Sequence, residues 1–522
     1  MDTIKDSWEK LQGQRSAMLE RSRDCAELTL PYVLPPEGYD GTGGLPTPYQ
    51  SLGARGVNNL TSKMLLALFP TNTAFFRFSL NPELVKQLTE ETGAESAQIK
   101  GALEDALRLR ENQLLRRLET GNLRATLGSI FKHLIVAGNA MLYLPKKGLS
   151  RMYALDQYAV KRDPMGTVTK LVIKEKVHPS TLDEKVTLVC QVVTDGRDNT
   201  EMCEVYTCMM LTESGGYEWH QEINDIEVPG SKGSSPKGET PPYLPLRWQA
   251  VSGNDYGIGL VEEYLGDLRS LEGLMKSVIG FSAAAAKIVI MLHPNSSTDE
   301  DSLATAESGD IVEGTMQDID VLQLDKYADF KVAKTVMDDL TMRLSHAFLL
   351  QSGTVRDAER VTAAEISAMA QELEDVLGGV YTVMSQELQL PLVKRLISSE
   401  KAAGKFPKLP KVKGEDSVDP VIVTGFDALG RGHELNKLRG FIQDLTGMIG
   451  EQALGLIDPS KIAKRLGHGH NIDVSDFLKS EDQMQQEQQA AQQQQMQQTL
   501  LEKGTAPAVS GMAQGMNQQQ TQ

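Results

Sequence analysis

The sequence predicts an α+β protein that is predominantly α-helical and is built from several structural units. Three observations point there. Apolar residues recur with helical spacing over long stretches, among them Gly259 to Lys287 and Thr362 to Leu390. A block rich in β-branched and aromatic residues lies between Ala140 and Ile223. The chain has 522 residues, 40% apolar and 24% charged, which is enough for a large core and for three or four units.

The first half of the chain is expected to begin with helices and to continue as a mostly antiparallel sheet. Helical spacing covers residues 1–30, 50–69 and 95–144, and a loop with five Pro and four Gly separates the first two stretches. Strands are expected near 140–145, 158–163, 167–177, 186–193, 203–210 and 217–223. Asp163 to Gly166 is predicted to form a hairpin turn, and residues 229–245 are predicted to form a loop.

The second half is expected to be organised around long helices. One helix is predicted over 259–287, another over 328–350 and a third over 362–390. Pro391 should kink or break the third, and helix should continue to about Ala403. Short strands (IVIML, DIVEG and IDVLQL) are expected between the first two helices. A linker over 405–420 precedes a strand at Val421 and shorter helices over 427–480. The last 42 residues include 16 Gln and are predicted to be disordered or loosely helical.

Charge and cysteine content exclude some classes of protein. With 53 Lys and Arg against 70 Asp and Glu, the net charge of −17 argues against binding nucleic acid by bulk positive charge. Four cysteines are too few to staple a chain of this length, so reduced thiols are expected. The most apolar stretch, Val278 to Leu292, is short for a membrane span and contains Lys287. A soluble intracellular protein is therefore predicted.

Three glycines recur every seven residues in the first long helix, at Gly266, Gly273 and Gly280. Each costs about 1 kcal/mol relative to Ala in an isolated helix. A close contact with another helix would explain all three, and weak spots in an ordinary buried helix remain the alternative.

Known catalytic motifs are absent from the sequence. It contains no P-loop, no G-x-S-x-G, no H-E-x-x-H and no EF-hand loop. Cys203-x4-Cys208 has poor spacing for zinc and alternates like a strand, and His468-Gly469-His470 offers only two ligands. These absences disfavour an enzyme, although an unidentified hydrolase stays open.

Six segments are long and low in degeneracy: 53–70, 136–145, 256–272, 323–334, 359–366 and 372–393. The first reads GARGVNNLTSKMLLALFP and the last ELEDVLGGVYTVMSQELQLPLV. In these segments, and over nearly its whole length, the chain resembles the portal proteins, which are the head-to-tail connectors of short-tailed phages (podoviruses) of the autographivirus kind.

The resemblance implies a portal fold with wing, stem, clip and crown regions. Residues 1–256 would form a mixed α/β wing, 257–287 the first stem helix, 288–326 the clip, 327–350 the second stem helix, 351–361 the tunnel loop, 362–426 the spine helix and the return to the wing, 427–480 the crown, and 481–522 a disordered Gln-rich tail. The three glycines would then lie where stem helices of neighbouring subunits pack.

The same resemblance implies a homo-dodecamer ring at one capsid vertex of the virion, assembled in the host cytoplasm. Double-stranded DNA would be packaged and later ejected through the ring, with transient contacts that do not depend on sequence. Expected partners are the terminase large subunit, then a tail adaptor protein, and the capsid, scaffolding and internal core proteins. No membrane, cofactor, metal or catalytic activity is expected. Another tail connector, such as an adaptor, is the alternative within the same class.

A ring of acidic chains would repel DNA, and low affinity favours sliding because strong phosphate pairing would stall transport. Some cations are still needed to centre the duplex. The candidates are Arg356 and Arg360 in the tunnel loop, and Lys331, Lys334 and Arg343 on the second stem helix. The two loop arginines could instead pair with acids of the same loop or of a neighbouring subunit. The three stem residues could equally lie on a solvated or salt-bridged face.

Overall fold

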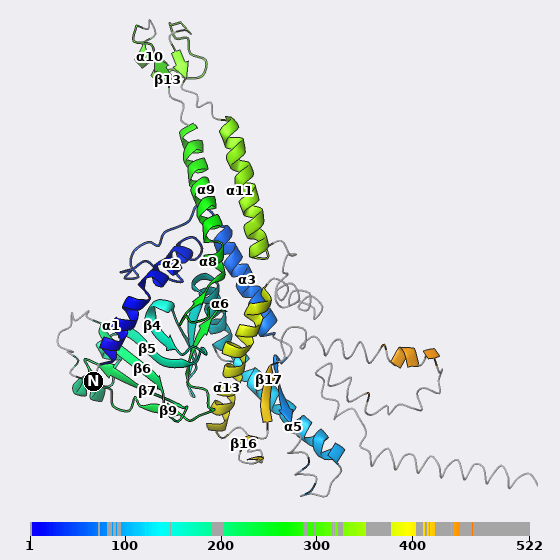
Figure 1. Cartoon of the computed structure of the whole chain (residues 1–522). Coiled ribbons are helices and arrows are strands. Elements are labelled where there is room, and N and C mark those ends of the chain that lie inside the picture. The colour runs from blue at the N-terminus through cyan, green and yellow to red at the C-terminus, as the bar shows by residue number, and fades with distance from the viewer. Residues whose placement is uncertain are drawn as a thin grey trace, which may run out of the picture. The chain divides into compact units, whose positions relative to one another are not determined.

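The structure is a computed structural model, and it describes residues 3–70, 74–80, 96–120, 122–146, 148–190, 202–285, 290–295, 299–315, 327–350, 377–402 and 418–422, with isolated positions elsewhere up to residue 462. The chain divides into two units, Met1–Ala428 and Leu429–Gln522. All elements below belong to the first unit (Figure 1). The predicted tunnel loop, the first part of the predicted spine helix, nearly all of the predicted crown and the Gln-rich tail lie outside the described residues.

Two helices form the centre of the main core. They are α3 (Leu52–Leu68) and α6 (Leu123–Ala137), both predicted from apolar spacing, and most of their residues are buried. Helix α6 ends at Gly138, whose φ is +70°. A Cβ at Gly138 would lie 2.4 Å from the backbone nitrogen of Gly259, so glycine permits both the left-handed conformation and the close approach. This contact places the end of α6 against the start of α8 (Leu260–Glu263).

Two antiparallel sheets account for most of the strands. The smaller has β2 (Asn139–Tyr143) between β10 (Tyr243–Arg247) and β3 (Arg151–Tyr153). The larger runs β4 (Tyr158–Arg162), β5 (Val168–Val177), β6 (Cys203–Leu211), β7 (Tyr217–Ile223) and β8 (Ile226–Glu227), with β9 (Gly233–Ser235) also paired to β7. The predicted hairpin turn is confirmed, because the Gly166 N–H donates to the Asp163 carbonyl oxygen at 2.9 Å between β4 and β5.

The amino-terminal helices α1 (Ile4–Gln14) and α2 (Ser16–Glu27) are also confirmed. Ile4 and Trp8 of α1 pack on the larger sheet, in a cluster of their own with Ala159, Val172, Tyr206 and Cys208. Between the helices, the buried Arg15 guanidinium donates to the carbonyl oxygen of Leu155 at 2.6 Å. Helix α1 is therefore fixed to the sheet by apolar packing and by hydrogen bonds.

The remaining elements complete the first unit. They are α5 (Ser96–Thr120), β1 (Phe76–Leu80) paired with β17 (Val418–Ile422), β11 (Gln249–Ala250) with β12 (Gly257–Ile258), β15 (Lys411–Val412) with β16 (Glu415–Asp416), and the short 3-10 turns Leu155–Gln157 and Pro179–Thr181. The strand predicted at Val421 is confirmed as part of β17.

Three strand predictions are wrong or incomplete. Residues 184–189 form helix α7 (Glu184–Val189) rather than part of a strand. The strands on either side of it in the chain, β5 and β6, pair directly with each other, so α7 lies in their connection. The predicted loop 229–245 contains β9 and the start of β10, although its Pro and Gly content suggested otherwise. DIVEG at 310–314 is exposed except for the half-buried Val312, and it has no strand assignment.

The helix predicted over 259–287 is interrupted at Tyr264, so that α8 is followed by α9 (Leu265–Ala285). Of the kink or break predicted at Pro391, the break is wrong, because Pro391 lies inside α13 (Leu390–Ala402); the predicted continuation of helix to about Ala403 is confirmed. A π-helical turn at Ser385–Gln389 directly precedes it, and the Leu390 N–H donates to the Ser385 carbonyl oxygen. The wider turn accommodates a proline that lacks an N–H and would otherwise crowd the preceding turn.

Candidate nucleic-acid interface

Helices α9 and α11 (Tyr327–Ala347) lie side by side (Figure 1). Each has 21 residues and is therefore about 31 Å long at 1.5 Å per residue. Their buried side chains gather in the halves nearest α3, at Leu265, Leu268 and Leu271 on α9 and at Leu340 and Leu344 on α11. The other halves expose apolar side chains, including Ile279, Val332 and Val336. This exposed surface is available for contact with other chains.

Hydrogen bonds fix the base of α9 to the proline-rich loop before α3. The Glu272 carboxylate accepts from the backbone N–H groups of Tyr49 at 2.9 Å and of Gln50 at 3.1 Å. Arg269 forms an ion pair with Asp24 of α2. The position of α9 is thus set by polar contacts as well as by its buried leucines.

Gly266, Gly273 and Gly280 all lie on the exposed side of α9. A Cβ at any of them would meet no atom of the described chain within 4 Å. Packing within the described subunit therefore does not require glycine at these positions, and the reading of weak spots in a buried helix does not fit their exposure.

The predicted cations of α11 fall on different sides of the helix. Lys331 and Lys334 are exposed and lie about 60° apart around the axis. Arg343 is also exposed but lies about 180° from Lys334. Its guanidinium is 3.5 Å from the Asp267 carboxylate of α9. The structure therefore groups the two lysines and ties Arg343 to the neighbouring helix; Arg356 and Arg360 lie outside the described residues.

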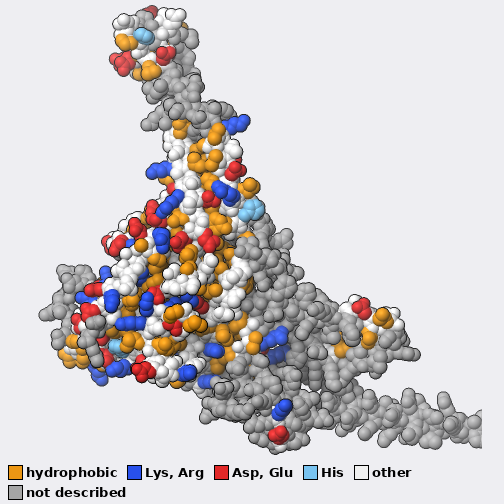
Figure 2. Space-filling model, in the orientation of Figure 1, with side chains coloured by type: hydrophobic (Ala, Val, Ile, Leu, Met, Phe, Trp, Pro, Cys, Tyr) orange, Lys and Arg blue, Asp and Glu red, His pale blue; other side chains and the backbone are white. Residues whose placement is uncertain are grey.

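The negative charge of the chain is distributed unevenly. Helix α11 carries three Asp against two Lys and one Arg, and α9 carries one Asp and one Glu against one Arg and one Lys, so each has a formal net charge of zero. Figure 2 shows both signs of charge along this pair of helices. Residues 288–326 instead contain nine Asp and Glu and one Lys, a net charge of −8 out of the total of −17.

The acidic segment 288–326 connects α9 to α11. Its strands β13 (Ile290–Leu292) and β14 (Ile319–Val321) pair antiparallel, which confirms two of the three short strands predicted there. Helix α10 (Glu300–Thr305) lies between them in the chain and was not predicted. The side chain of Ile311 is 98% exposed.

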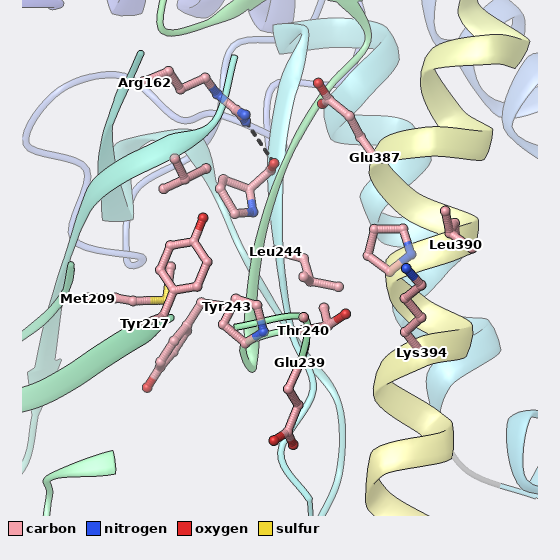
Figure 3. Close-up of a pocket in the computed structure, with 15 residues that line it drawn as sticks. Arg162, Met209, Tyr217, Glu239, Thr240, Tyr243, Leu244, Glu387, Leu390 and Lys394 are labelled. Carbon is pink, nitrogen blue, oxygen red and sulfur yellow. Dashed lines mark hydrogen bonds between the residues drawn. The ribbon is translucent and has the colours of Figure 1, made fainter. Parts of the chain in front are cut away.

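A cavity of about 340 Å³ lies between the larger sheet, β10 and α13 (Figure 3). The Arg162 guanidinium donates to the Pro245 carbonyl oxygen at 2.9 Å, and Glu387 accepts from Arg247 Nε at 3.0 Å. Burial raises the pKa of Tyr217 above its usual range. Of the charged side chains that line the cavity, Arg162, Glu239 and Glu387 contact other parts of the protein, and Lys394 is exposed.

The remaining features concern metal ligands, apolar helices and thiols among the residues that the structure describes. No group of three or more His, Cys, Asp or Glu side chains there could hold a metal ion. Within the same residues, no helix is long and apolar enough to cross a membrane. All four cysteines are free thiols, as expected, and burial raises the pKa of Cys25 to about 12.

A family model described as "bacteriophage head to tail connecting protein" matches residues 1–478. The chain belongs to this family. It is 38% identical to the portal protein of Enterobacteria phage T3 over 93% of this chain and 89% of that protein. It is 37% identical to the portal protein of Escherichia phage T7 over 100% of this chain and 95% of that protein.

A third relative, the portal protein of Enterobacteria phage SP6, is 33% identical over 97% of this chain and 95% of its own. Among solved structures, the virion of a native gene transfer agent particle contains a chain with 14% identity and a TM-score of 0.34, covering 77% of this chain and 93% of its own. That TM-score is too low to support an inference. The resemblance to portal proteins is confirmed, and so is the α+β fold class. All three of these relatives are named portal proteins, and none is named as a tail adaptor or as a hydrolase, the two alternatives that the sequence left open.

Sequence reasoning missed the residues that seat α11 on the core. These are Asn59 and Lys63 of α3, which hydrogen-bond to the carboxyl end of α11. The sequence carries no signal for them, because polar residues beside the apolar positions Leu60 and Met64 are normally solvated.

Proposed function

We propose that twelve copies of this portal-family chain form a ring at one capsid vertex and that double-stranded DNA is packaged and ejected through its centre. The observation that carries the proposal is the pair of helices α9 and α11, with exposed outer halves, in a chain similar to portal proteins over its whole length. In this proposal 257–287 and 327–350 are the stem, and α11 contributes to the channel wall.

Ring closure would use heterologous contacts, in which different faces of neighbouring subunits meet. Gly266, Gly273 and Gly280 present a flat, exposed strip on α9 where a second helix could approach closely. The exposed apolar side chains of α9 and α11 provide surface that such a contact would bury.

Helices α9 and α11 each have a formal net charge of zero, which suits a channel wall along which DNA slides. A wall with several unpaired cations per subunit would bind phosphates and oppose movement. Lys331 and Lys334 lie close together on α11 and are the described candidates for centring the duplex. Arg356 and Arg360, in the tunnel loop 351–361, are proposed for the same role. Arg343 is a weaker candidate because it pairs with Asp267.

The segment 288–326 is proposed as the clip, where the terminase large subunit docks during packaging and a tail adaptor docks afterwards. Its net charge of −8 calls for a basic face on each partner and for docking that weakens with salt. Residues 1–256 and 362–426 would form the wing and the spine, and 427–480 the crown, facing the capsid, scaffolding and internal core proteins. The ring would assemble in the host cytoplasm and hydrolyse nothing itself.

Rotationally averaged images of the purified protein test the ring directly. Twelve copies around an open axial hole are expected, and a chain that stays monomeric at high concentration would contradict the proposal. Charge reversal tests the channel: procapsids carrying Arg356→Glu and Arg360→Glu, or Lys331→Glu and Lys334→Glu, should package DNA more slowly with intact rings. Lys232→Glu is the control, because Lys232 lies on an exposed loop before β9. Packaging at the wild-type rate by a reversed pair would remove that pair from the channel.

A further inference from the structure

The carboxyl end of α11 is closed by a hydrogen-bonding pattern that usually has glycine at its turning point. The Leu350 N–H donates to the Ser345 carbonyl oxygen at 2.8 Å, and the Leu349 N–H donates to the His346 carbonyl oxygen at 3.1 Å. Together these bonds form a Schellman motif, in which the residue after the cap takes the left-handed conformation. That residue is Leu349, with φ of +53°. A side chain with a Cβ makes this conformation unfavourable, so surrounding contacts must hold it.

Helix α3 supplies those contacts. The Asn59 side-chain amide donates to the carbonyl oxygens of Phe348 at 3.1 Å and of Leu349 at 3.0 Å. The Lys63 ammonium donates to the Leu349 carbonyl oxygen at 2.9 Å. These oxygens belong to the end of a helix, where no further turn supplies donors. Gly56, on the same side of α3, leaves room for the fully buried ring of Phe348.

Burial makes the position of Lys63 unusual. Its side chain is 1% exposed, although lysine is among the residues least often buried. A positive charge at the carboxyl end of a helix is favourable because the helix dipole places partial negative charge there. Asn59 and Lys63 are four residues apart and so meet the end of α11 from one side of α3.

We propose that Asn59 and Lys63 are positioning residues for the DNA channel, because they fix where α11 stops and in which direction the chain leaves it. This inference rests on the proposed function, in which α11 contributes to the channel wall. Unwinding or extension by one turn would shift the following chain by about 5.4 Å along the helix axis. Holding Leu349 in one conformation keeps the lining identical in every subunit of the ring.

The test compares Lys63→Met and Asn59→Leu, which keep approximate size but remove the donors, with Lys132→Met. Lys132 is the matched control, because it lies on α6 and its ammonium donates to another oxygen, the Tyr32 hydroxyl, at 3.0 Å. Full-length variants are assembled into procapsids. Hydrogen exchange of the Leu349 and Leu350 amides, the thermal midpoint of the ring and the rate of DNA packaging with terminase are then measured.

Both test variants should form rings with the thermal midpoint of the control. Their Leu349 and Leu350 amides should exchange about tenfold faster or more, as expected for losing hydrogen bonds that involve a charged or buried donor. Packaging should slow severalfold for these variants and stay at the wild-type rate for the control.

Wild-type exchange, or faster exchange with wild-type packaging, would overturn the inference. Failure of both variants to form rings would overturn it as well, since the residues would then be needed for folding. Failure of the proposed function looks different: the wild-type ring itself would pass no DNA, while the exchange data would still report on the contact.

Discussion

Replacing Gly56 by alanine tests how α11 is seated on the core. The new Cβ would lie 2.4 Å from Phe348 Cγ, 2.7 Å from Cδ2 and 2.8 Å from Cβ. These atoms include the root of the side chain, which cannot swing away, so α3 and α11 must separate. Overpacking of this kind costs about 1–3 kcal/mol. Replacing glycine by alanine inside a helix also stabilises the helix by about 1 kcal/mol, which offsets part of this cost. The Gly56→Ala variant should therefore be less stable by up to about 2 kcal/mol.

Gly128→Ala is the control for this substitution. Gly128 lies in the middle of α6, and a Cβ there would meet no atom of the described chain within 4 Å. The same change should therefore stabilise the protein by up to about 1 kcal/mol. Urea unfolding of dispersed subunits measures both variants, and their midpoints should move in opposite directions. If Gly56→Ala raises the midpoint as much as Gly128→Ala does, Phe348 is not packed against α3 as described.

Two further predictions concern other parts of the chain. Gly273→Leu should abolish ring formation, seen by native mass spectrometry, while raising subunit stability by up to about 1 kcal/mol, because the site is open within the described subunit; a well-formed ring would contradict the proposed stem contact. His133 of α6 is buried, and burial lowers its pKa to about 4. Because the unfolded state takes up the proton first, stability should fall as the pH drops from about 6.5 towards 4, by about 2 kcal/mol at pH 5. His133→Phe should lose this dependence in urea unfolding at pH 7 and pH 5, and an unchanged pH dependence would show that His133 is not its source.

Long helices were predictable because their signal is repeated many times. Helices α3 and α11 carry apolar residues at successive turns, and their bounds differ little from those predicted, whereas α5 and α6 were predicted only as one helical stretch over 95–144. Short elements depend on what is available for pairing. The segment that forms α7 is rich in valine, but the strands before and after it, β5 and β6, pair with each other. The segment that begins β10 contains prolines yet completes the smaller sheet beside β2.

The candidate site was predictable only where residues lie on one helix. Two placements follow from 3.6 residues per turn: the three glycines lie on one side of α9, and Lys331 lies close to Lys334 around the axis of α11. The ion pair of Arg343 with Asp267 joins positions far apart in the sequence, and periodicity holds no information about it. Lys63 was missed for another reason, because a lysine in a helix is normally solvated, and only the tertiary structure supplies the carbonyl oxygen of Leu349.

The seating of α1 on the larger sheet has a practical consequence. Ile4 and Trp8 cover apolar side chains that belong to three different strands, and the Ile4 N–H donates to the Glu222 carboxylate at 2.9 Å. Deleting this first helix would expose these apolar side chains to water and would promote aggregation. An affinity tag or fluorescent fusion should therefore be joined to the amino terminus through a long flexible linker, so that helix α1 can still pack on the larger sheet.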